Sequence, residues 1–471
     1  MGASFDDRLG RARLLIVGNG AVSRCTQEVL LRLGVPGTRV TVLDAADSEA
    51  ASPMARAGAR FVMDRLRPDT IDRSYAIHVG GGDVVVDLTT EVGAFDALRA
   101  ATAAGAAYVN TAFESWETIV DADLPFLDRT LYGFHLRFDR LRAGLRGPTA
   151  VVEHGANPGL VSHWVRRALA DMALHVGPHD EALLTSVAEG RWADACRLLR
   201  VKVVHISERD TQTTVVPRRP GEFACTWSVK GFFEEGGAPA ELGWGTHEPA
   251  LPAGARTWDE GPRHQLMIER PGVDTIVRSW VPTGGPIHGM VVTHGEANTI
   301  TSALSSYDER GDVLWRPTVH YAYQPPDVAI ESWWECRANG WRLQDDRRIL
   351  ADDIDEGIDE LGVLLLGDLG GWWCGSQLSI HEARRLVGAG HNATTLQVAA
   401  SVVAAVAWVA EHPDSGMLVP DELDHETILA TADPWLGPCP SIPTSWRPDS
   451  ADSPFPRKPH PEPFAFGNFL A

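Results

Sequence analysis

The stretch Arg13-Leu-Leu-Ile-Val-Gly18-Asn-Gly20-Ala-Val-Ser23 decides the fold of this chain. Its apolar run is typical of a buried parallel strand, and the two glycines that follow predict a tight turn. After Ser23, apolar residues recur at helical spacing as far as Leu33, and Gly34 marks the end of the helix. A strand, a GxGxxS turn and a helix in this order are the fingerprint of a dinucleotide-binding unit.

Each position of this fingerprint has a physical task. Gly18 permits the tight turn, and Gly20 lets the backbone approach a pyrophosphate. Ser23 takes the place of the usual third glycine and is small enough for close packing of helix on strand. The first turn of the helix offers its amides and a partial positive charge to the phosphates. We therefore expect Gly18, Gly20, Ala21 and Val22 to bind a cofactor.

Asp44 predicts which dinucleotide is bound. It ends the next strand, 39–44, and lies 26 residues after Gly18. An acid at this place binds the adenosine ribose hydroxyls and repels a 2′-phosphate, which favours NAD over NADP. Thr89, at the end of the strand 84–89, lies at the same predicted sheet edge and completes the expected cofactor site.

Further strands extend this unit into a fold class. Strands at 84–89 and 107–110, with the helix 94–104 between them, predict a parallel sheet covered by helices. We expect an α/β protein with a Rossmann-like, NAD-binding domain over residues 1–150. Residues 151–385 are predicted to form a second, α+β domain for substrate binding and dimerisation. It contains a helix at 160–173 and strands at 201–206, 213–216, 275–281, 288–293 and 319–323.

The C-terminal third is predicted to be helical and then extended. Residues 352–410 have a helical pattern, and the segment 386–437 is expected to return to the NAD domain. The apolar run 396–410 has 15 residues, which is short for a bilayer and suits a packed helix. Residues 438–471 contain nine prolines and predict an extended or partly ordered tail.

Composition excludes several function classes. The 471 residues carry 63 acidic and 42 basic side chains, a formal charge of −21. Such a surface argues against nucleic acid or an anionic membrane as the main partner and is compatible with a cationic small substrate. The six cysteines form no CxxC pair, and no spacing signals a metal site. Without a signal-peptide pattern at the N-terminus, we expect a cytoplasmic protein.

Several long motifs carry a resemblance to a known family. In order and spacing they resemble the bacterial homospermidine synthases, relatives of the saccharopine dehydrogenases. The matching segments run from the fingerprint to about residue 446. They are Gly155-Ala-Asn-Pro-Gly159, His205-Ile-Ser-Glu-Arg-Asp-Thr-Gln212, Thr226-Trp-Ser-Val229, Pro239 to Glu248, Val292-Thr-His294, Arg316 to Tyr323, Gly357 to Val363 and Gly375 to Ser379.

The resemblance implies an aminoalkyl transferase with tightly bound, recycled NAD. Putrescine would be oxidised to an imine, a second putrescine would displace ammonia, and re-reduction would give homospermidine. It also implies a homodimer. Such chemistry must hold a dication, deprotonate one amine and keep the imine from free water.

The resemblance also implies an amine site. Trp227 would place its ring against the cationic substrate, as a cation–π contact requires. Glu114, Glu208 and Glu235 match acidic positions that bind the amines. Glu91 falls where the family more often has aspartate. Any single glutamate is more often a solvated charge, but Glu91 and Glu114 follow sheet strands at the edge where α/β ligands bind.

Two further residues complete the predicted site, and two features stand outside it. Asn157 would bind the reacting amine or the nicotinamide, although a turn before Pro158 explains it equally well. His294 is our candidate for proton transfer near neutral pH. The acidic stretch 352–360 is interpreted as a solvated helix start, with the place of its last two acids left open. Lys230 stands where the family carries an acid, and it would repel a diamine if it faced the pocket.

Two alternatives remain. A dehydrogenase of the saccharopine or carboxynorspermidine type would consume free NAD(P)H and need an arginine or lysine clamp for a substrate carboxylate. A scaffold or sensor would bind NAD without catalysis. The acids around Trp227 favour a diamine over the first, and the retained set of site residues argues against the second.

Overall fold

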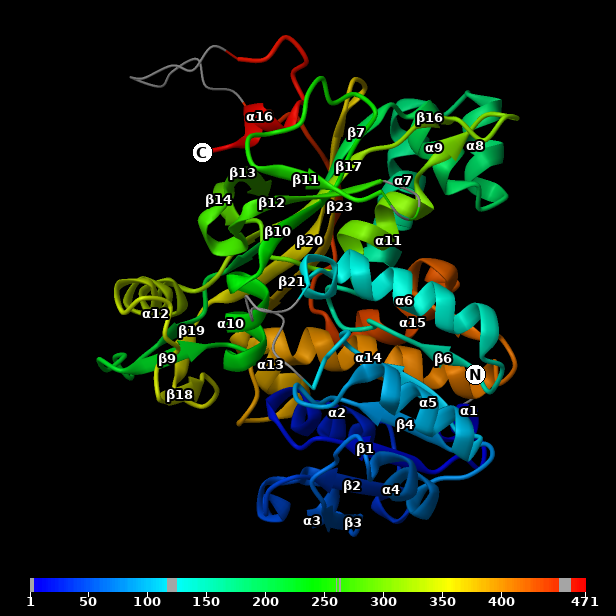
Figure 1. The fold of residues 1–471 in the computed structure, drawn as a ribbon, viewed down its shortest axis with the longest axis vertical. Helices are drawn as coiled ribbons and strands as arrows, with labels where there is room; N and C mark the ends of the chain where they lie inside the picture. Colours follow the sequence, from blue (N-terminus) through cyan, green and yellow to red (C-terminus); the bar gives the residue numbers. More distant parts are fainter. Residues whose placement is uncertain (1–3, 117–124, 260, 262–263, 449–458) are drawn as a thin grey trace.

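The computed structural model describes residues 4–116, 125–259, 261, 264–448 and 459–471. Two sheets organise these residues, and helices from the C-terminal third lie between them (Figure 1). The lower part of Figure 1 holds the N-terminal sheet in blue and cyan, and the upper part holds the second sheet in green and yellow. This arrangement confirms the predicted fold class.

The N-terminal sheet is parallel throughout, with strand order β22-β6-β5-β4-β1-β2-β3. Four of its strands, β1, β2, β4 and β5, fall where the sequence predicts them, and β3 is an additional strand at the edge of the sheet. The strands are β1 (Leu14–Val17), β2 (Val40–Asp44), β3 (Arg60–Met63), β4 (Val84–Asp87), β5 (Ala107–Asn110), β6 (Ala150–Val151) and β22 (Met417–Leu418).

Helices cover both faces of this sheet. Leu14 and Ile16 of β1 pack into one core with α2 (Ala21–Arg32) and α14 (Ala393–Glu411). The alternate residues Leu15 and Val17 pack into a second core with α4 (Ile71–His78) and α5 (Ala94–Ala104). A buried parallel strand is apolar on both faces, which explains the continuous apolar run in the sequence.

The segment 386–437 supplies a helix and a strand to the N-terminal sheet. α14 packs against α2, β4 and β5, and β22 pairs in parallel with β6. α14 has 19 residues, more than the run counted in the sequence, so its length and composition would suffice to cross a membrane. It is instead a core helix, because 89% of its most apolar window is buried inside the protein.

The second sheet has the order β11-β12-β10-β17-β7-β20-β21-β23; β14 also pairs with β17, and β13 pairs with β14. α7 (Leu160–Val176) packs on β20 and β21. The strands are β7 (Val201–Asp210), β10 (Pro239–Gly243), β11 (Ala255–Thr257), β12 (Gln265–Pro271), β13 (Ile276–Val281), β14 (Gly285–Met290), β17 (Thr318–Gln324), β20 (Ile358–Gly367), β21 (Gly370–Ser379) and β23 (Ser441–Thr444).

Shorter elements connect these layers. The helices are α1 (Phe5–Leu9), α3 (Pro53–Arg56), α6 (Leu131–Gly144), α8 (Glu181–Ala188), α9 (Trp192–Leu198), α10 (Val229–Gly237), α11 (Glu296–Ala303), α12 (Asp327–Ala338), α13 (Ile380–Val387), α15 (His425–Ala432) and α16 (Phe466–Phe469). The strands form the pairs β8 (Thr213–Thr214) with β19 (Ile354–Glu356), β9 (Glu222–Cys225) with β18 (Asp346–Ile349), and β15 (Ser306–Tyr307) with β16 (Val313–Trp315).

The helical interpretation of residues 352–410 is wrong over its first half. β19, β20 and β21 occupy most of residues 354–379, and helix begins only at Ile380. β20 lies between β7 and β21 in the middle of the second sheet. The acids at its start are therefore held in a strand rather than on a solvated helix.

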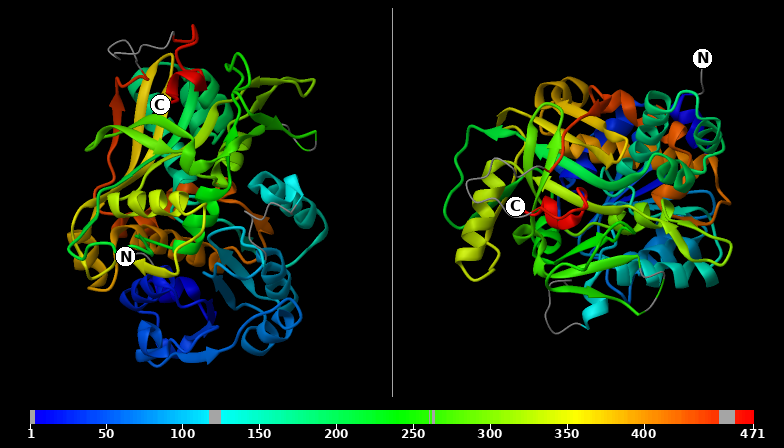
Figure 2. Two further views of the ribbon diagram at one scale, coloured as in Figure 1. Left: turned by 60° about the vertical axis from the view of Figure 1, so that its left-hand side comes forward. Right: turned by 90° about the horizontal axis from the view of Figure 1, so that it is seen from above.

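The C-terminal tail is more ordered than its prolines suggest. β23 pairs with β21, and the aromatic rings of Phe464, Phe466 and Phe469 are buried in the core of the second sheet. Figure 2 shows the end of the tail, in red, against the second sheet and far from the N-terminal sheet. The described part of the tail therefore belongs to this domain.

Candidate functional site

The glycine turn is shaped to approach a ligand closely. Gly18 has φ +91°, and a Cβ there would lie 2.9 Å from the carbonyl oxygen of Leu88. A Cβ on Gly20, at the N-terminus of α2, would meet only open space. The Ser23 hydroxyl donates to the Gly18 carbonyl oxygen at 2.7 Å, so serine stabilises the turn from its place inside the helix. An open helix N-terminus of this kind is suited to a pyrophosphate.

Asp44 lies beside this turn with both carboxylate oxygens oriented by backbone. Asn19 donates its N–H to Asp44 Oδ2 at 2.6 Å, and Ala46 donates its N–H to Oδ1 at 2.8 Å. Asp44 nevertheless lines the cavity, where its negative charge would meet the ribose of a bound dinucleotide.

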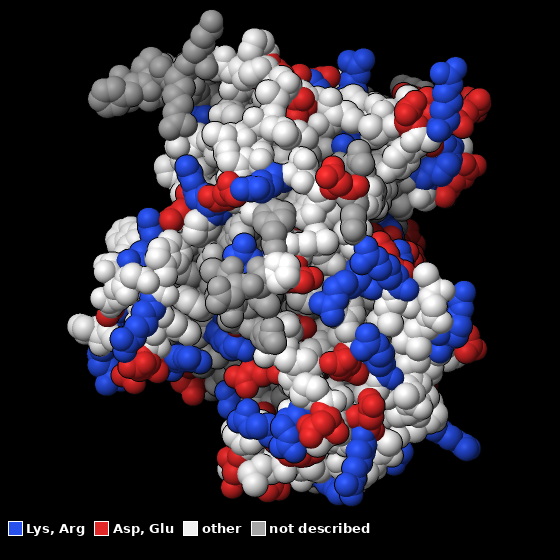
Figure 3. Space-filling view, viewed as in Figure 1, with Lys and Arg blue, Asp and Glu red and all other residues white. Residues whose placement is uncertain are grey.

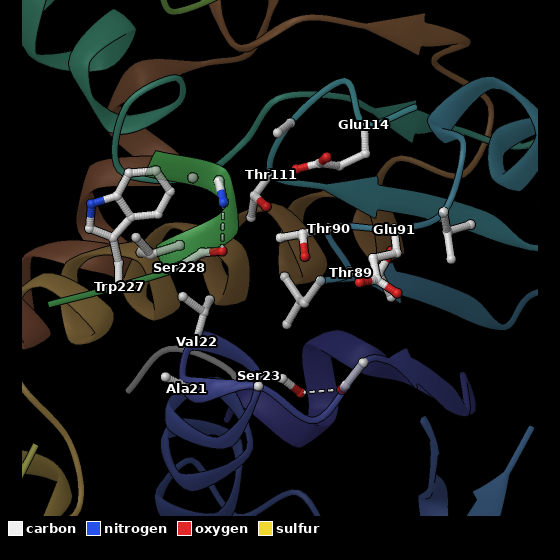
Figure 4. A pocket seen from close by; sticks show the side chains of 18 of the residues that line it. Ala21, Val22, Ser23, Thr89, Thr90, Glu91, Thr111, Glu114, Trp227 and Ser228 are labelled. Carbon is white, nitrogen blue, oxygen red and sulfur yellow. Dashed lines mark hydrogen bonds between the residues drawn. The ribbon is translucent and has the colours of Figure 1, made fainter. Parts of the chain in front are cut away.

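One cavity of about 400 Å³ runs from this turn into the second domain. Its size lies in the range of cofactor and ligand sites. Figure 4 shows Ala21 to Ser23 of α2 on one side, the strand-end residues Thr89 to Glu91, Thr111 and Glu114 on another, and Trp227 with Ser228 across from them. All thirteen sequence-predicted site residues line this cavity: Gly18, Gly20, Ala21, Val22, Asp44, Thr89, Glu91, Glu114, Asn157, Glu208, Trp227, Glu235 and His294.

His294 is held as an imidazolium by two carboxylates. Its Nε2 lies 2.9 Å from Glu235 Oε2, and its Nδ1 lies 3.4 Å from Glu296 Oε1. Burial opposes the charged ring, but Glu296 and Glu235 outweigh it and hold the His294 pKa well above its ordinary value. His294 is therefore protonated at neutral pH and is suited to donate a proton first. The ring also packs on Tyr321, with centroids 4.5 Å apart.

Three carboxyl groups lie together beside the cavity, and Glu208 is the one of them that lines it. Glu208 and Asp210 lie on one face of β7, and Asp359 of β20 is the register partner of Asp210. All three are almost fully buried. Burial and the charge of Asp210 raise the pKa of Glu208 to about 8, and burial raises the pKa of Asp210 to about 6. Burial and its two neighbours also raise the pKa of Asp359.

Neutral side chains orient these acids. The Tyr321 hydroxyl donates to Glu208 Oε2. The Thr226 hydroxyl donates to Asp210 Oδ2 at 2.8 Å, and the Thr394 hydroxyl donates to Asp359 Oδ2 at 2.5 Å. No lysine or arginine pairs with Glu208, Asp210 or Asp359 among the residues that the structure describes. Buried acids without a basic partner favour binding of a cation from outside the protein.

The remaining predicted amine ligands differ in their surroundings. Glu114 and Trp227 line the cavity between the glycine turn and the buried acids. Burial, with the charges of Glu234 and Glu235, raises the pKa of Glu114 to about 8. Asn157 lies beside Tyr321, and its buried Nδ2 makes no well-directed hydrogen bond with any described residue, so this amide can donate to a ligand.

Glu91 and Lys230 have other surroundings than the sequence suggests. The Glu91 side chain is 61% exposed, lies 3.5 Å from Arg65 Nη1 and is on the opposite side of the pocket from Trp227 in Figure 4. Its position favours the cofactor half over an amine site. Lys230 does not line the cavity; its ammonium donates to the Thr90 carbonyl oxygen at 2.6 Å and lies 3.8 Å from Glu234 Oε1.

Four residues outside the predicted set shape the site: Asp210, Glu296, Tyr321 and Asp359. Asp210 had a signal in the sequence, because residues two apart in a strand share a face with Glu208. Tyr321 and Asp359 come from strands on either side of β7, and sequence spacing does not reveal that pairing. The net charge of the chain does not reveal the position of the site either, since acidic and basic side chains are interspersed over the face shown in Figure 3.

Comparisons with known proteins agree with this geometry. Residues 14–151 match the saccharopine dehydrogenase NADP binding domain, and residues 155–438 match the saccharopine dehydrogenase C-terminal domain. The homospermidine synthase of Mesorhizobium japonicum is 36% identical over 467 residues, covering 97% of this chain and 96% of that protein. That of Blastochloris viridis is 37% identical over 444 residues, covering 92% of each.

Solved structures give the same grouping. The homospermidine synthase of Legionella pneumophila, solved in complex with NAD, matches 98% of each chain with a TM-score of 0.88 and 34% identity. A saccharopine dehydrogenase from Saccharomyces cerevisiae, with a TM-score of 0.51 and 11% identity over 92% of this chain, shares the fold. By sequence and by structure over nearly its whole length, this chain belongs to the homospermidine synthase family, within the saccharopine dehydrogenase-like proteins.

Proposed function

We propose that the protein is an NAD-dependent homospermidine synthase that joins two putrescine molecules and releases ammonia. One observation carries the proposal: a single cavity connects the dinucleotide turn with a tryptophan face and with the buried carboxyl group of Glu208, which pairs with no lysine or arginine in the part of the chain that the structure describes. A diamine is the small molecule that suits such an end, because its ammonium groups need carboxylates and its chain tolerates an aromatic face.

The cofactor half fits NAD. The space above Gly20 would accept the pyrophosphate, and Asp44 would bind the ribose hydroxyls while repelling a 2′-phosphate. This favours NAD although the matching family model is named for NADP, and the Legionella relative was solved with NAD. When bound, NAD would accept a hydride from the substrate and later return it.

The chain's own residues divide the remaining tasks. Glu208, with Asp210 and Asp359, would hold the ammonium group far from the cofactor. Trp227 would lie against the chain of the diamine. Glu235 and His294, joined at 2.9 Å, would exchange a proton with the reacting amine.

The saccharopine-type alternative lacks its recognition group. Such a dehydrogenase must bind a substrate carboxylate, for which arginine or lysine is the usual partner. Among the described residues that line the cavity, Arg65 is the only arginine or lysine, and it lies beside Glu91 in the cofactor half.

Incubation with putrescine alone tests the proposal. The purified protein should carry NAD and should form homospermidine and ammonia in equal amounts without added cofactor. Turnover that requires a keto or semialdehyde acid together with NAD(P)H would instead support the saccharopine-type reaction. Inertness with NAD bound would support a scaffold.

Cytoplasmic location and homodimerisation remain predictions from the sequence and from the family resemblance. Light scattering of the NAD-loaded protein would measure the second directly, and a monomer at working concentration would contradict it.

A further inference from the structure

A second, smaller cavity lies directly behind His294. Its volume is about 40 Å³, which is room for about one molecule the size of water. Glu114, Glu235 and His294 line both this rear cavity and the large front cavity. These three side chains therefore form a wall shared by the two spaces, and a group leaving the front cavity at His294 meets the rear one.

The rear cavity has more acidic than basic groups around it. Glu114, Glu153, Glu234 and Glu235 line it, and His294 is the basic residue among them. Two more basic groups reach these acids from outside: Lys230 lies 3.8 Å from Glu234, and His135 lies 3.0 Å from Glu153. Glu114 has no ion pair among the residues that the structure describes.

Glu153 provides an independent sign that the rear cavity lacks hydrogen-bond donors. The residue is 1% exposed and lines the rear cavity, yet its Oε2 makes no hydrogen bond with any described residue. His135 Nε2 is close, but it also makes no hydrogen bond of acceptable direction. Glu153 is thus ion-paired with His135, but the pair leaves its carboxylate without a well-directed donor. A buried carboxylate in this state is costly, and a small cation with N–H groups would supply the donors.

The size and the charge of the cavity together select the ligand. A diamine is too large for about 40 Å³, whereas ammonium is close to water in size. Ammonium also presents four N–H donors, which suit several carboxylates at once. Ammonia is the small product of the proposed reaction, and this step rests on that proposed function.

We propose that the rear cavity is an ammonium site that receives the nitrogen released during amine exchange. The ammonium group of the second putrescine loses two protons in all, one before its nitrogen bonds to the imine carbon and one after that bond has formed. The first nitrogen gains two protons: with the first it leaves as ammonia, taking the electron pair of the broken carbon–nitrogen bond, and with the second it becomes ammonium. His294 and Glu235 pass these protons from the incoming to the leaving nitrogen, so two diamine dications yield a homospermidine trication and one ammonium ion.

Capture behind His294 has a chemical advantage. Ammonia that stayed in the front cavity could attack the new imine and reverse the exchange. Held as ammonium between Glu153 and Glu235, it has no free electron pair and cannot do so.

Thallium(I), a heavy cation of ammonium-like size, tests the site without substrate. A crystal structure of the NAD-loaded protein in thallium acetate should show an anomalous peak in the rear cavity beside Glu153 and Glu235. Ammonium should displace it at concentrations at which sodium does not, and Glu153→Gln should remove it. A cavity that holds only water at saturating thallium, or a peak that persists in Glu153→Gln, would overturn the proposal.

Inhibition by the product gives a second, kinetic test. Ammonium chloride should inhibit homospermidine formation more strongly than sodium chloride of equal ionic strength. In Glu153→Gln the half-inhibiting ammonium concentration should rise at least about tenfold, whereas the exposed Glu309→Gln should behave as the unmodified protein. Equal inhibition in all three would contradict the ammonium site.

The two tests separate the ammonium site from the proposed function. Thallium binding without any homospermidine formation would refute the synthase reaction and leave a cation site. Homospermidine formation with neither thallium binding nor ammonium inhibition would refute the rear site alone.

Discussion

The buried acids make putrescine binding dependent on pH in a direction that the structure fixes. Burial raises the pKa of Glu208 to about 8, so at pH 7 about one molecule in ten carries the ionised carboxylate, and at pH 9 about nine in ten do. An ammonium group needs the ionised form. Putrescine remains a cation throughout, since alkyl ammonium groups titrate near about 10.4.

The apparent Kd for putrescine should therefore fall about tenfold between pH 7 and pH 9, a change of about 1.4 kcal/mol. Isothermal titration calorimetry on the NAD-loaded protein measures it. An acid of ordinary pKa would already be ionised at pH 7 and would give no change between pH 7 and pH 9. Tighter binding at pH 7 than at pH 9 would refute the reasoning.

Glu208→Gln isolates the group responsible. Loss of one charged hydrogen bond should weaken binding about 10- to 100-fold. The dependence between pH 7 and pH 9 should also flatten, because removing the Glu208 charge lowers the pKa of Asp359 toward its ordinary range. Glu309→Gln, on an exposed loop, is the matched control and should keep both affinity and pH dependence. A Glu208→Gln profile as steep as that of the unmodified protein would assign the titration elsewhere.

Three other substitutions test separate parts of the structure. Trp227→Ala should weaken putrescine binding about tenfold by loss of the cation–π contact while the bound NAD, measured after release, stays constant; lost NAD would contradict the placement of this ring. Lys230→Met removes the hydrogen bond to the carbonyl oxygen of Thr90, a residue that lines the cavity beside the cofactor half, so the dissociation of NAD should become about tenfold faster. Tighter putrescine binding in this variant would instead show that the lysine repels the substrate. Phe466→Ala should cost about 3–5 kcal/mol of the unfolding free energy measured with denaturant, because the ring is buried; a cost below about 0.5 kcal/mol would indicate a loose tail.

The parts of the fold that the sequence predicts are those set by local rules. The turn from Gly18 to Ser23 depends on the chemistry of a few adjacent residues, so both its position and its tasks can be recognised in the sequence. The same is true of the strand that ends at Asp44. The family motifs also made it possible to predict site residues such as Trp227 and His294, which line the same cavity although they lie far apart in the sequence.

The parts that were missed depend on pairing across the chain. Asp359 reaches the site only because β20 pairs with β7, about 150 residues earlier, and an acidic run read alone resembles a helix start. Strand ends predicted the correct sheet edge for Glu91 but not the direction of its side chain. In the tail, the nine prolines hid the better signal, three phenylalanines within six residues from Phe464 to Phe469.

The return of α14 and β22 to the N-terminal sheet sets the order of events during synthesis. Residues 4–116 contain the whole glycine turn, but α2 alone covers only part of one face of their sheet, and the rest of that face stays exposed until the helix 393–411 has been made. A ribosome must translate almost the entire chain before that apolar face is covered. The nucleotide site can thus reach its final form only at the end of translation, and cofactor loading follows synthesis rather than accompanying it.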